Sequence, residues 1–297
     1  MRASRRKFII LFLLFLLAIS SSPELLSSTN GEAPRELEVV FLDVGQGDAI
    51  LVTTPSGFRA LIDGGDGKGP FVQDQAERVI IPYLRRAGIE RLDAIVLTHA
   101  HFDHIGGLIT IIKEKTIKIG EVLDPGEPHP SMAYLELLQA IDERPEIAYR
   151  QPRAGENLNW GVDVKVEVLN PPYLIGDDNE SSIVVRITYG ECSFLLTGDA
   201  GGVAENLMIR KYGRNLQSDI LKVGHHGSRH SSTEKFLKYV NPKSVVISCG
   251  IRNKHGHPHK EVNKRLKKYG AKIYRTDHQG TITITTDGKV YKITTTK

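Results

Sequence analysis

The sequence predicts an α/β fold, a four-layer α/β/β/α sandwich in which two β-sheets pack face to face and helices cover their outer faces. Two features of the chain predict it. Each half contains short segments rich in β-branched residues that follow one another closely, as antiparallel strands do. Each half also contains apolar segments that alternate with amphipathic helical segments. Two repeats of this arrangement provide two sheets, each with helices on its outer side.

The first half opens with a meander of strands and continues with strand and helix steps. Turn-forming residues at 45–48 and 55–57 separate the first three strands, and Gly88 ends the first helix. In chain order, we expect strands over 38–44, 49–54 and 59–62, a helix over 71–87, a strand over 93–97, a helix over 108–115, a strand over 119–123 and a helix over 131–142.

The second half repeats this arrangement after Trp160. Three neighbouring strands are expected first, and strands then alternate with helices before a Thr-rich pair of strands closes the chain. The predicted strands are 162–169, 182–189, 193–196, 219–223, 244–248, 272–275, 282–284 and 290–294, and the predicted helices are 202–212, 233–239 and 260–269.

Residues 1–22 have the pattern of an export signal. Four basic residues precede an uninterrupted apolar stretch of twelve, 8–19, and small residues follow. Twelve residues are short for a membrane span, which needs about 20. We therefore expect a cleaved signal peptide, with an uncleaved anchor as the alternative, and an exported protein that is secreted, periplasmic or on the cell surface. Residues 23–36 are polar and turn-rich and predict a flexible linker, which leaves 37–297 as one domain.

The charge of the exported chain is balanced. The first twenty residues hold four positive charges and no acidic ones, so without them the net charge falls from +4 to zero. Such a chain has no global field that attracts nucleic acid, and binding of a polyanion would need a local basic patch. The two cysteines, Cys192 and Cys249, lie in apolar strand-like segments, which favours two buried thiols over a disulfide.

Residues 97–107 concentrate metal-binding side chains at the end of a predicted strand. His99 and His101 lie two residues apart, so on extended backbone both point to one side, and Asp103 and His104 follow on a turn. Packing does not require this density of ionisable groups. The spacing predicts that the first pair binds one metal and the second pair a neighbouring one. Imidazole with carboxylate suits zinc or manganese.

Two later strand ends offer further ligands. Asp199 follows one apolar strand, and the pair His225 and His226 follows another. An isolated aspartate there is more often a helix cap, and an isolated histidine pair more often lies on the surface. Because ligands gather at strand ends in layered α/β folds, we expect Asp199 to bridge two metals. One histidine of the pair, with His226 preferred, completes the second site, and the other is left for substrate.

At these residues the chain resembles the metallo-β-lactamase superfamily. His99, His101, Asp103 and His104 match its His-x-His-x-Asp-His motif, Asp199 its bridging aspartate, the 225–226 pair its last histidine, and Asp63 the early Asp-Gly that supports the histidine loop. Within that superfamily the chain is most similar to the soluble hydrolase domain of ComEC-type DNA-uptake competence proteins. This likeness rests on segments 41–49, 179–182, 222–228 and 248–258, and spans about residues 38–286.

One departure from the superfamily concerns the first metal. A third histidine usually lies between the Asp63 and Asp199 elements, whereas this stretch contains only His129, in a Pro-rich turn. The sequence offers Asn179 and Ser182 where that ligand is expected. The first metal would then hold only His99, His101 and the shared aspartate, and should bind weakly or keep extra water.

The resemblance implies a metal-dependent hydrolase, and the prediction is a phosphodiesterase or nuclease with two divalent ions. Two metals about 3.5 to 4 Å apart would share a hydroxide that attacks a phosphorus or acyl centre. The predicted catalytic residues are His225, His257 and Asp103, which is also a predicted metal ligand. His225 or His257 would stabilise the developing charge or protonate the leaving group. The predicted substrate-binding residues are Asn179, Ser182, Ser228, Asn253 and Lys254.

The basic stretch 252–275 supports a phosphodiester substrate, with nucleic acid as a candidate. It holds nine positive charges against one acidic residue. The alternative is a solvated helix face over 260–268. Two other functions also remain open. One is hydrolysis of other esters or amides, such as a phosphocholine ester or a β-lactam. The other is a catalytically weak DNA-binding module accessory to DNA uptake.

Overall fold

The computed structural model describes residues 36–69 and 73–297, which all fall in one compact unit, Pro34–Lys297. The predicted export segment, 1–22, lies outside the described residues, as does the predicted linker except for its last residue. Within the described ranges, none of the helices combines the length and apolar character needed to span a bilayer.

The first sheet has eight strands in the order β15-β14-β1-β2-β3-β4-β5-β6. The strands from β15 to β3 pair antiparallel, as the predicted meander requires, and those from β3 to β6 pair parallel. The bounds are β1 (Leu37–Phe41), β2 (Ile50–Thr53), β3 (Arg59–Ile62), β4 (Arg91–Val96), β5 (Lys118–Leu123), β6 (Ala148–Arg150), β14 (Ile282–Thr286) and β15 (Tyr291–Thr295).

The second sheet has seven strands in the order β13-β12-β11-β10-β9-β8-β7. Here the strands from β7 to β10 pair antiparallel and those from β10 to β13 parallel. The bounds are β7 (Asn157–Leu158), β8 (Lys165–Asn170), β9 (Val184–Tyr189), β10 (Cys192–Leu196), β11 (Ile220–Lys222), β12 (Ser244–Ile247) and β13 (Lys272–Arg275).

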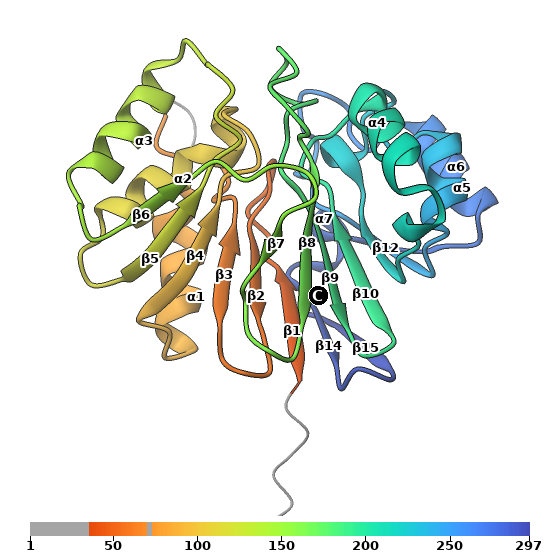
Figure 1. The fold of residues 1–297 in the computed structure, drawn as a ribbon, viewed down its shortest axis with the longest axis horizontal. Helices are drawn as coiled ribbons and strands as arrows, with labels where there is room; N and C mark the ends of the chain where they lie inside the picture. Colours follow the sequence, from red (N-terminus) through yellow and green to blue (C-terminus); the bar gives the residue numbers. More distant parts are fainter. Residues whose placement is uncertain (1–35, 70–72) are drawn as a thin grey trace, which may run out of the picture. The chain divides into compact units, whose positions relative to one another are not determined.

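Helices cover the outer face of each sheet, with α2 and α3 beside one and α4, α5 and α6 beside the other (Figure 1). Ser131 caps α3 by accepting from the Tyr134 amide, and Thr233 caps α5 in the same way. The helical segments are η1 (Ala76–Ile80), α1 (Ile81–Arg86), α2 (Phe102–Lys113), α3 (Met132–Asp142), α4 (Gly202–Tyr212), η2 (Gly213–Leu216), η3 (Gly224–Gly227), α5 (Glu234–Val240), α6 (Lys260–Lys268) and α7 (Thr276–Gln279).

Three apolar clusters hold the layers together and confirm the predicted sandwich. Along β1, Val39 and Phe41 face the second sheet, while Val40 between them faces the helices of the first layer. The first cluster joins the first sheet to α1, α2 and α3, the second lies between the sheets around Trp160, and the third joins the second sheet to α4, α5 and α6. Cys192 and Cys249 are buried free thiols, as predicted.

The structure differs from the predicted elements in several places. The helix predicted over 71–87 is η1 followed by α1, begins at Ala76 and ends at Arg86, and its first two predicted residues lie outside the described residues. Helix α2 begins at Phe102, six residues before its predicted start, so Asp103 and His104 lie in its first turn. Gly106 and Gly107 therefore lie inside the helix, where a Cβ would collide with the backbone of Gly67 or Gly64. Strands β6 and β7 and helix α7 are too short to show a period. Finally, β14 and β15 join the first sheet beside β1.

Candidate metal centre

The predicted metal ligands follow the carboxyl ends of parallel strands from both sheets. His99 and His101 come after β4, Asp199 comes after β10, and the 225–226 histidine pair comes after β11. The structure brings all of them together. Layered α/β folds place their ligands at this end of parallel strands because the backbone turns away there and leaves side chains around a crevice.

Four ligand atoms surround one point, which we call the second metal position. The Nε2 atom of His226 lies 3.2 Å from His104 Nε2, 3.4 Å from Asp103 Oδ2 and 3.4 Å from Asp199 Oδ2. His104 Nε2 and Asp199 Oδ2 are 3.5 Å apart. Four ligands that each lie about 2.1 Å from a tetrahedral cation are about 3.4 Å from one another. These residues therefore fit a divalent metal.

A first metal position lies beside it and uses two histidines. His99 Nε2 is 3.0 Å from His101 Nδ1 and 3.9 Å from Asp199 Oδ2. Asp199 Oδ2 thus faces both positions, which is the placement that a bridging role requires. His99 is buried, whereas the His101 side chain is 40% exposed. The first position therefore has fewer protein ligands and more contact with solvent than the second.

Asp63 supports the second position from behind. Its Oδ2 lies 2.7 Å from His104 Nδ1 and accepts from the Thr98 hydroxyl, and its Oδ1 accepts from the Thr98 amide. A carboxylate on the outer nitrogen of a ligand histidine orients the ring and leaves Nε2 free to bind metal. Asp63 has a φ of 58°, a strained value for a residue with a side chain, at the end of β3.

Asp48 and Lys222 form a buried ion pair under the cluster, and sequence reasoning gave neither residue a role. Asp48, His104, Asp199 and His226 each offer an atom within 4.8 Å of the others. The Asp48 carboxylate, however, lies on the Nδ1 side of both rings, 3.7 Å from His226 Nδ1 and 4.0 Å from His104 Nδ1. It therefore supports the two rings and does not face the second metal position. Lys222 also donates to Gly198 O. A lone lysine in an apolar strand was the available signal, because its burial requires a carboxylate.

The electrostatics of the cluster favour positive charge at the second position. Burial lowers the pKa of His226, but Asp199, Asp103 and Asp48 outweigh it and raise that pKa to about 10. For the same reason the pKa of His104 lies well above its usual value. Burial raises the pKa of Asp199, and the two histidines lower it well below its usual range. A field that holds protons on imidazoles also attracts a metal cation.

The loop that carries the histidine pair is held in an unusual conformation. His225 and His226 both have positive φ, 48° and 51°, and His226 Nδ1 donates to Ser248 O. On the segment that follows this loop, the Thr233 amide and hydroxyl donate to Glu205 of α4, which is only 2% exposed. Burial raises the pKa of Glu205 to about 7. The strained turn therefore depends on contacts made by neighbouring elements.

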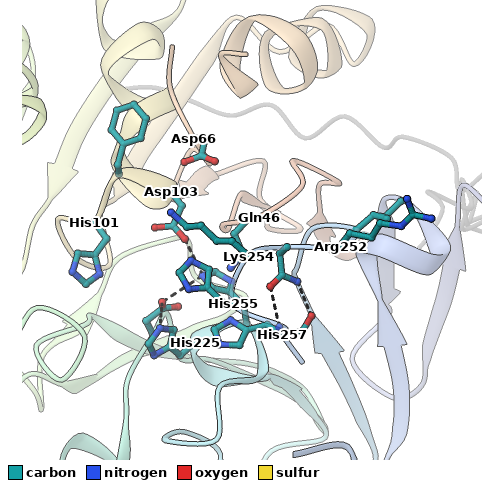
Figure 2. A pocket seen from close by; sticks show the side chains of 14 residues that line it. Gln46, Asp66, His101, Asp103, His225, Arg252, Lys254, His255 and His257 are labelled. Carbon is teal, nitrogen blue, oxygen red and sulfur yellow. Dashed lines mark hydrogen bonds and ion pairs between the residues drawn. The ribbon is translucent and has the colours of Figure 1, made fainter. Parts of the chain in front are cut away.

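A pocket of about 900 Å³ opens over the metal positions. Its wall includes His225, His255 and His257, and Figure 2 shows Lys254 extending into it on the side of Asp103. Burial and the neighbouring histidines lower the pKa of His257 to about 3, and burial also lowers the pKa of His225. The remaining lining residues are Gln46, Asp66, His101, Phe102, Asp199, His226, Ile251, Arg252 and Asn253.

The predicted substrate-binding residues are only partly in this pocket. Lys254 and Asn253 line it, but the Asn253 amide is occupied by Gly250 O and by the backbone of His257, so it fixes the loop. Ser182 is buried and accepts from the Asp199 amide. Ser228 is buried and accepts from the His230 amide. Asn179 is not a lining residue. Of the five predicted residues, Lys254 and Asn253 therefore line the pocket, and the other three do not.

Other expectations about the mouth also change. His255 is exposed, lines the pocket and stacks on His257. Of the basic stretch 252–275, Arg252 and Lys254 line the pocket, whereas the cations of α6 do not. Lys268 instead pairs with Glu234. Asp66 and Gln46 lie at the mouth without a sequence prediction, because the loops that carry them have no ligand spacing.

The chain belongs to the metallo-beta-lactamase superfamily, whose family model matches residues 42–251. This match confirms the resemblance, and the observed sandwich confirms the predicted fold. A candidate metal site on this scaffold supports a metal-dependent hydrolase.

Two proteins of known name are similar to this chain over most of its length. It is 35% identical over 263 residues to ComE operon protein 3 of Bacillus subtilis (strain 168), covering 83% of this chain and 33% of that protein. It is 34% identical over 250 residues to competence protein ComA of Neisseria gonorrhoeae, covering 84% of this chain and 32% of that protein. The chain thus spans about a third of the length of these relatives.

Solved structures share the fold at low sequence identity. Igni18, a metallo hydrolase from Ignicoccus hospitalis KIN4/I, has a TM-score of 0.53 at 16% identity over 84% of this chain and 98% of that one. CmlA, a diiron beta-hydroxylase from Streptomyces venezuelae, has a TM-score of 0.51 at 14% identity over 82% of this chain and 53% of that one. Since one fold carries both chemistries, function must be argued from the site.

Proposed function

We propose that this chain is an exported phosphodiesterase that uses two divalent metals, zinc or manganese, and acts on nucleic acid. The observation that carries the proposal is the pocket over the metal positions, whose wall combines Lys254 with His225 and His257, two histidines of lowered pKa. A phosphodiester is an anion that can place one oxygen at the metals and another at a lysine or an N–H donor.

In this proposal, some residues of the site would hold metal and others would contact the substrate. His99, His101 and Asp199 would hold the first metal, and Asp103, His104, Asp199 and His226 the second. Bound there, the metals would supply an activated water and polarise a phosphoryl oxygen. His225 Nε2 lies 3.7 Å from Asp199 Oδ2 at the open side of the cluster, where the ring can donate a hydrogen bond to a phosphoryl oxygen.

Two roles were predicted for His257, stabilising the developing charge and protonating the leaving group, and we propose only the first. Because its pKa of about 3 leaves it neutral near pH 7, it is a poor source of a proton for the leaving group. A neutral imidazole still donates one N–H, and His257 lines the pocket. We therefore propose that His257 contacts the substrate by hydrogen bonding and does not act as the general acid.

We choose nucleic acid among the possible phosphodiesters because of the names of two similar proteins. One is named competence protein ComA, and the other is named ComE operon protein 3. Export draws on the pattern of residues 1–22, which precedes the described residues.

The test is metal content followed by hydrolysis. The purified chain should bind about two metals and, in manganese or zinc, hydrolyse bis-p-nitrophenyl phosphate and single-stranded DNA. Asp103→Ala and His104→Ala should abolish both activities while circular dichroism stays unchanged. Retained turnover in either folded variant would contradict the assignment.

The same assays separate the alternatives. Turnover of nitrocefin or of a phosphocholine ester, without phosphodiester cleavage, would assign another ester or amide substrate. DNA binding without turnover at full metal occupancy would instead assign a binding module.

A further inference from the structure

The first metal position lacks the third histidine that the wider superfamily usually has, and a pair of side chains lies behind His101 instead. We propose that Asp178 and His129 hold the His101 ring and so stabilise the first metal without binding it. This inference rests on the proposed function only in requiring a metal at that position.

The orientation of the His101 ring separates its two nitrogens. Nδ1 lies 3.0 Å from His99 Nε2 and therefore faces the first metal position. Nε2, on the other side of the ring, lies 3.9 Å from Asp178 Oδ2. Because the two ring nitrogens point apart, Asp178 cannot share a metal with His101 Nδ1. It acts on the outer N–H of the ring instead.

Asp178 is itself held in place by His129. Its Oδ2 lies 2.9 Å from His129 Nδ1, and its Oδ1 is buried without a hydrogen-bond partner among the described residues. The rings of His101 and His129 pack edge to face with centroids 5.8 Å apart. His129 also packs against the Tyr134 ring. The result is a chain of contacts from the metal position through His101 and Asp178 to His129.

The two loops that supply this chain come from different sheets and are tied together. His129 follows β5 of the first sheet, and Asp178 lies between β8 and β9 of the second. Glu127, two residues before His129, is buried, and its Oε2 accepts from the Ser181 hydroxyl and from the amides of Ile175 and Gly176. These hydrogen bonds fix the loop that carries Asp178 relative to the loop that carries His129.

The physical effect is the one that Asp63 has on His104, at a longer range. A carboxylate beside the outer nitrogen keeps the proton there, leaves the lone pair on the inner nitrogen for metal and makes the ring a stronger ligand. Removing such a carboxylate typically weakens metal binding by 10- to 100-fold. At the first position, the superfamily usually has a third histidine ligand. In this chain, Asp178 instead strengthens His101, a ligand that is already there.

The test measures metal affinity rather than turnover. We expect Asp178→Asn to weaken one of two manganese binding steps by about 10- to 100-fold in calorimetric titration and to leave the other unchanged. His129→Phe should weaken the same step less, and Asp178→Glu should restore it in part. The cobalt(II) absorption spectrum should change for one ion only.

Asp177→Asn is the matched control. It makes the same chemical change one residue away, and asparagine can still accept from the Glu180 amide as Asp177 does. Equal affinities for both metals in Asp178→Asn and Asp177→Asn would overturn the proposal, as would a wild-type chain that binds only one metal. A wild-type chain that binds two metals but cleaves no phosphodiester would contradict the proposed function and leave this inference standing.

Discussion

The two metal positions are unequal, although they share Asp199 and lie side by side. The second is buried, has four ligand atoms, and is supported from behind by Asp63, Asp48 and the Ser248 carbonyl. The first has two histidines of its own, one of them 40% exposed. Affinity follows the number of ligands and the rigidity with which they are held. We therefore expect the second position to bind metal more tightly and to fill first.

The largest effect is expected from a substitution of Asp199, the residue that the two metal positions share. Asp199→Ala should lose both metals and reduce phosphodiester turnover by about a thousandfold or more, because its carboxylate faces both positions. His99→Ala should lose one metal and retain the other. Elemental analysis beside turnover checks both variants. Two metals retained in Asp199→Ala would show that the positions are independent.

Removing the support under the second position should cost stability. Lys222→Met leaves the buried Asp48 carboxylate unpaired and should lower the free energy of unfolding by about 3 to 5 kcal/mol. The double variant Asp48→Asn with Lys222→Met should recover much of the loss, because no buried charge is then left alone. Urea denaturation of the metal-free proteins measures both. If the single and double variants are equally stable, the Asp48–Lys222 ion pair does not account for the loss of stability.

The buried carboxyl group of Glu205 predicts that stability depends on pH. Its pKa is raised from 4.5 to about 7, so the folded state binds the proton more tightly than the unfolded state. Stability from this group is present below about pH 4.5 and is lost as the pH rises through 7, a change on the order of 3 kcal/mol. Glu205→Gln should flatten unfolding free energy between pH 5 and 8. The same slope in both proteins would contradict this.

The smallest effect concerns the mouth of the pocket. Lys254→Ala should raise the KM for single-stranded DNA by about 3- to 10-fold and reduce the salt dependence of binding by about one charge. Lys264→Ala is the control, since Lys264 is exposed on α6 and does not line the pocket. If both variants weaken DNA binding equally, the α6 face also contacts the substrate.

Most of the fold could be predicted because its elements are long enough to show a period. The strands and helices of both halves lie close to their predicted bounds, and β3 and α4 match them. What was missed is short or lies at an edge, such as β6, β7 and α7. Helix α2 begins earlier than predicted because its first turn is occupied by polar ligands, which hide the apolar pattern there.

The ligands themselves were visible because histidine and aspartate at strand ends have no packing reason to be there. Asp48 and Asp178 carried no such signal. Each takes its role from a partner far along the chain, Lys222 for Asp48 and His101 for Asp178.

By itself, the sequence determined the layers, the family and the list of candidate metal ligands, because periodicity and ligand type are local properties. Only the tertiary structure decided that β14 and β15 join the first sheet, that His226 faces the metal and His225 the pocket, and that the α6 cations lie outside it. These outcomes depend on which strand ends and loops meet, and that is settled by burial of the three apolar clusters.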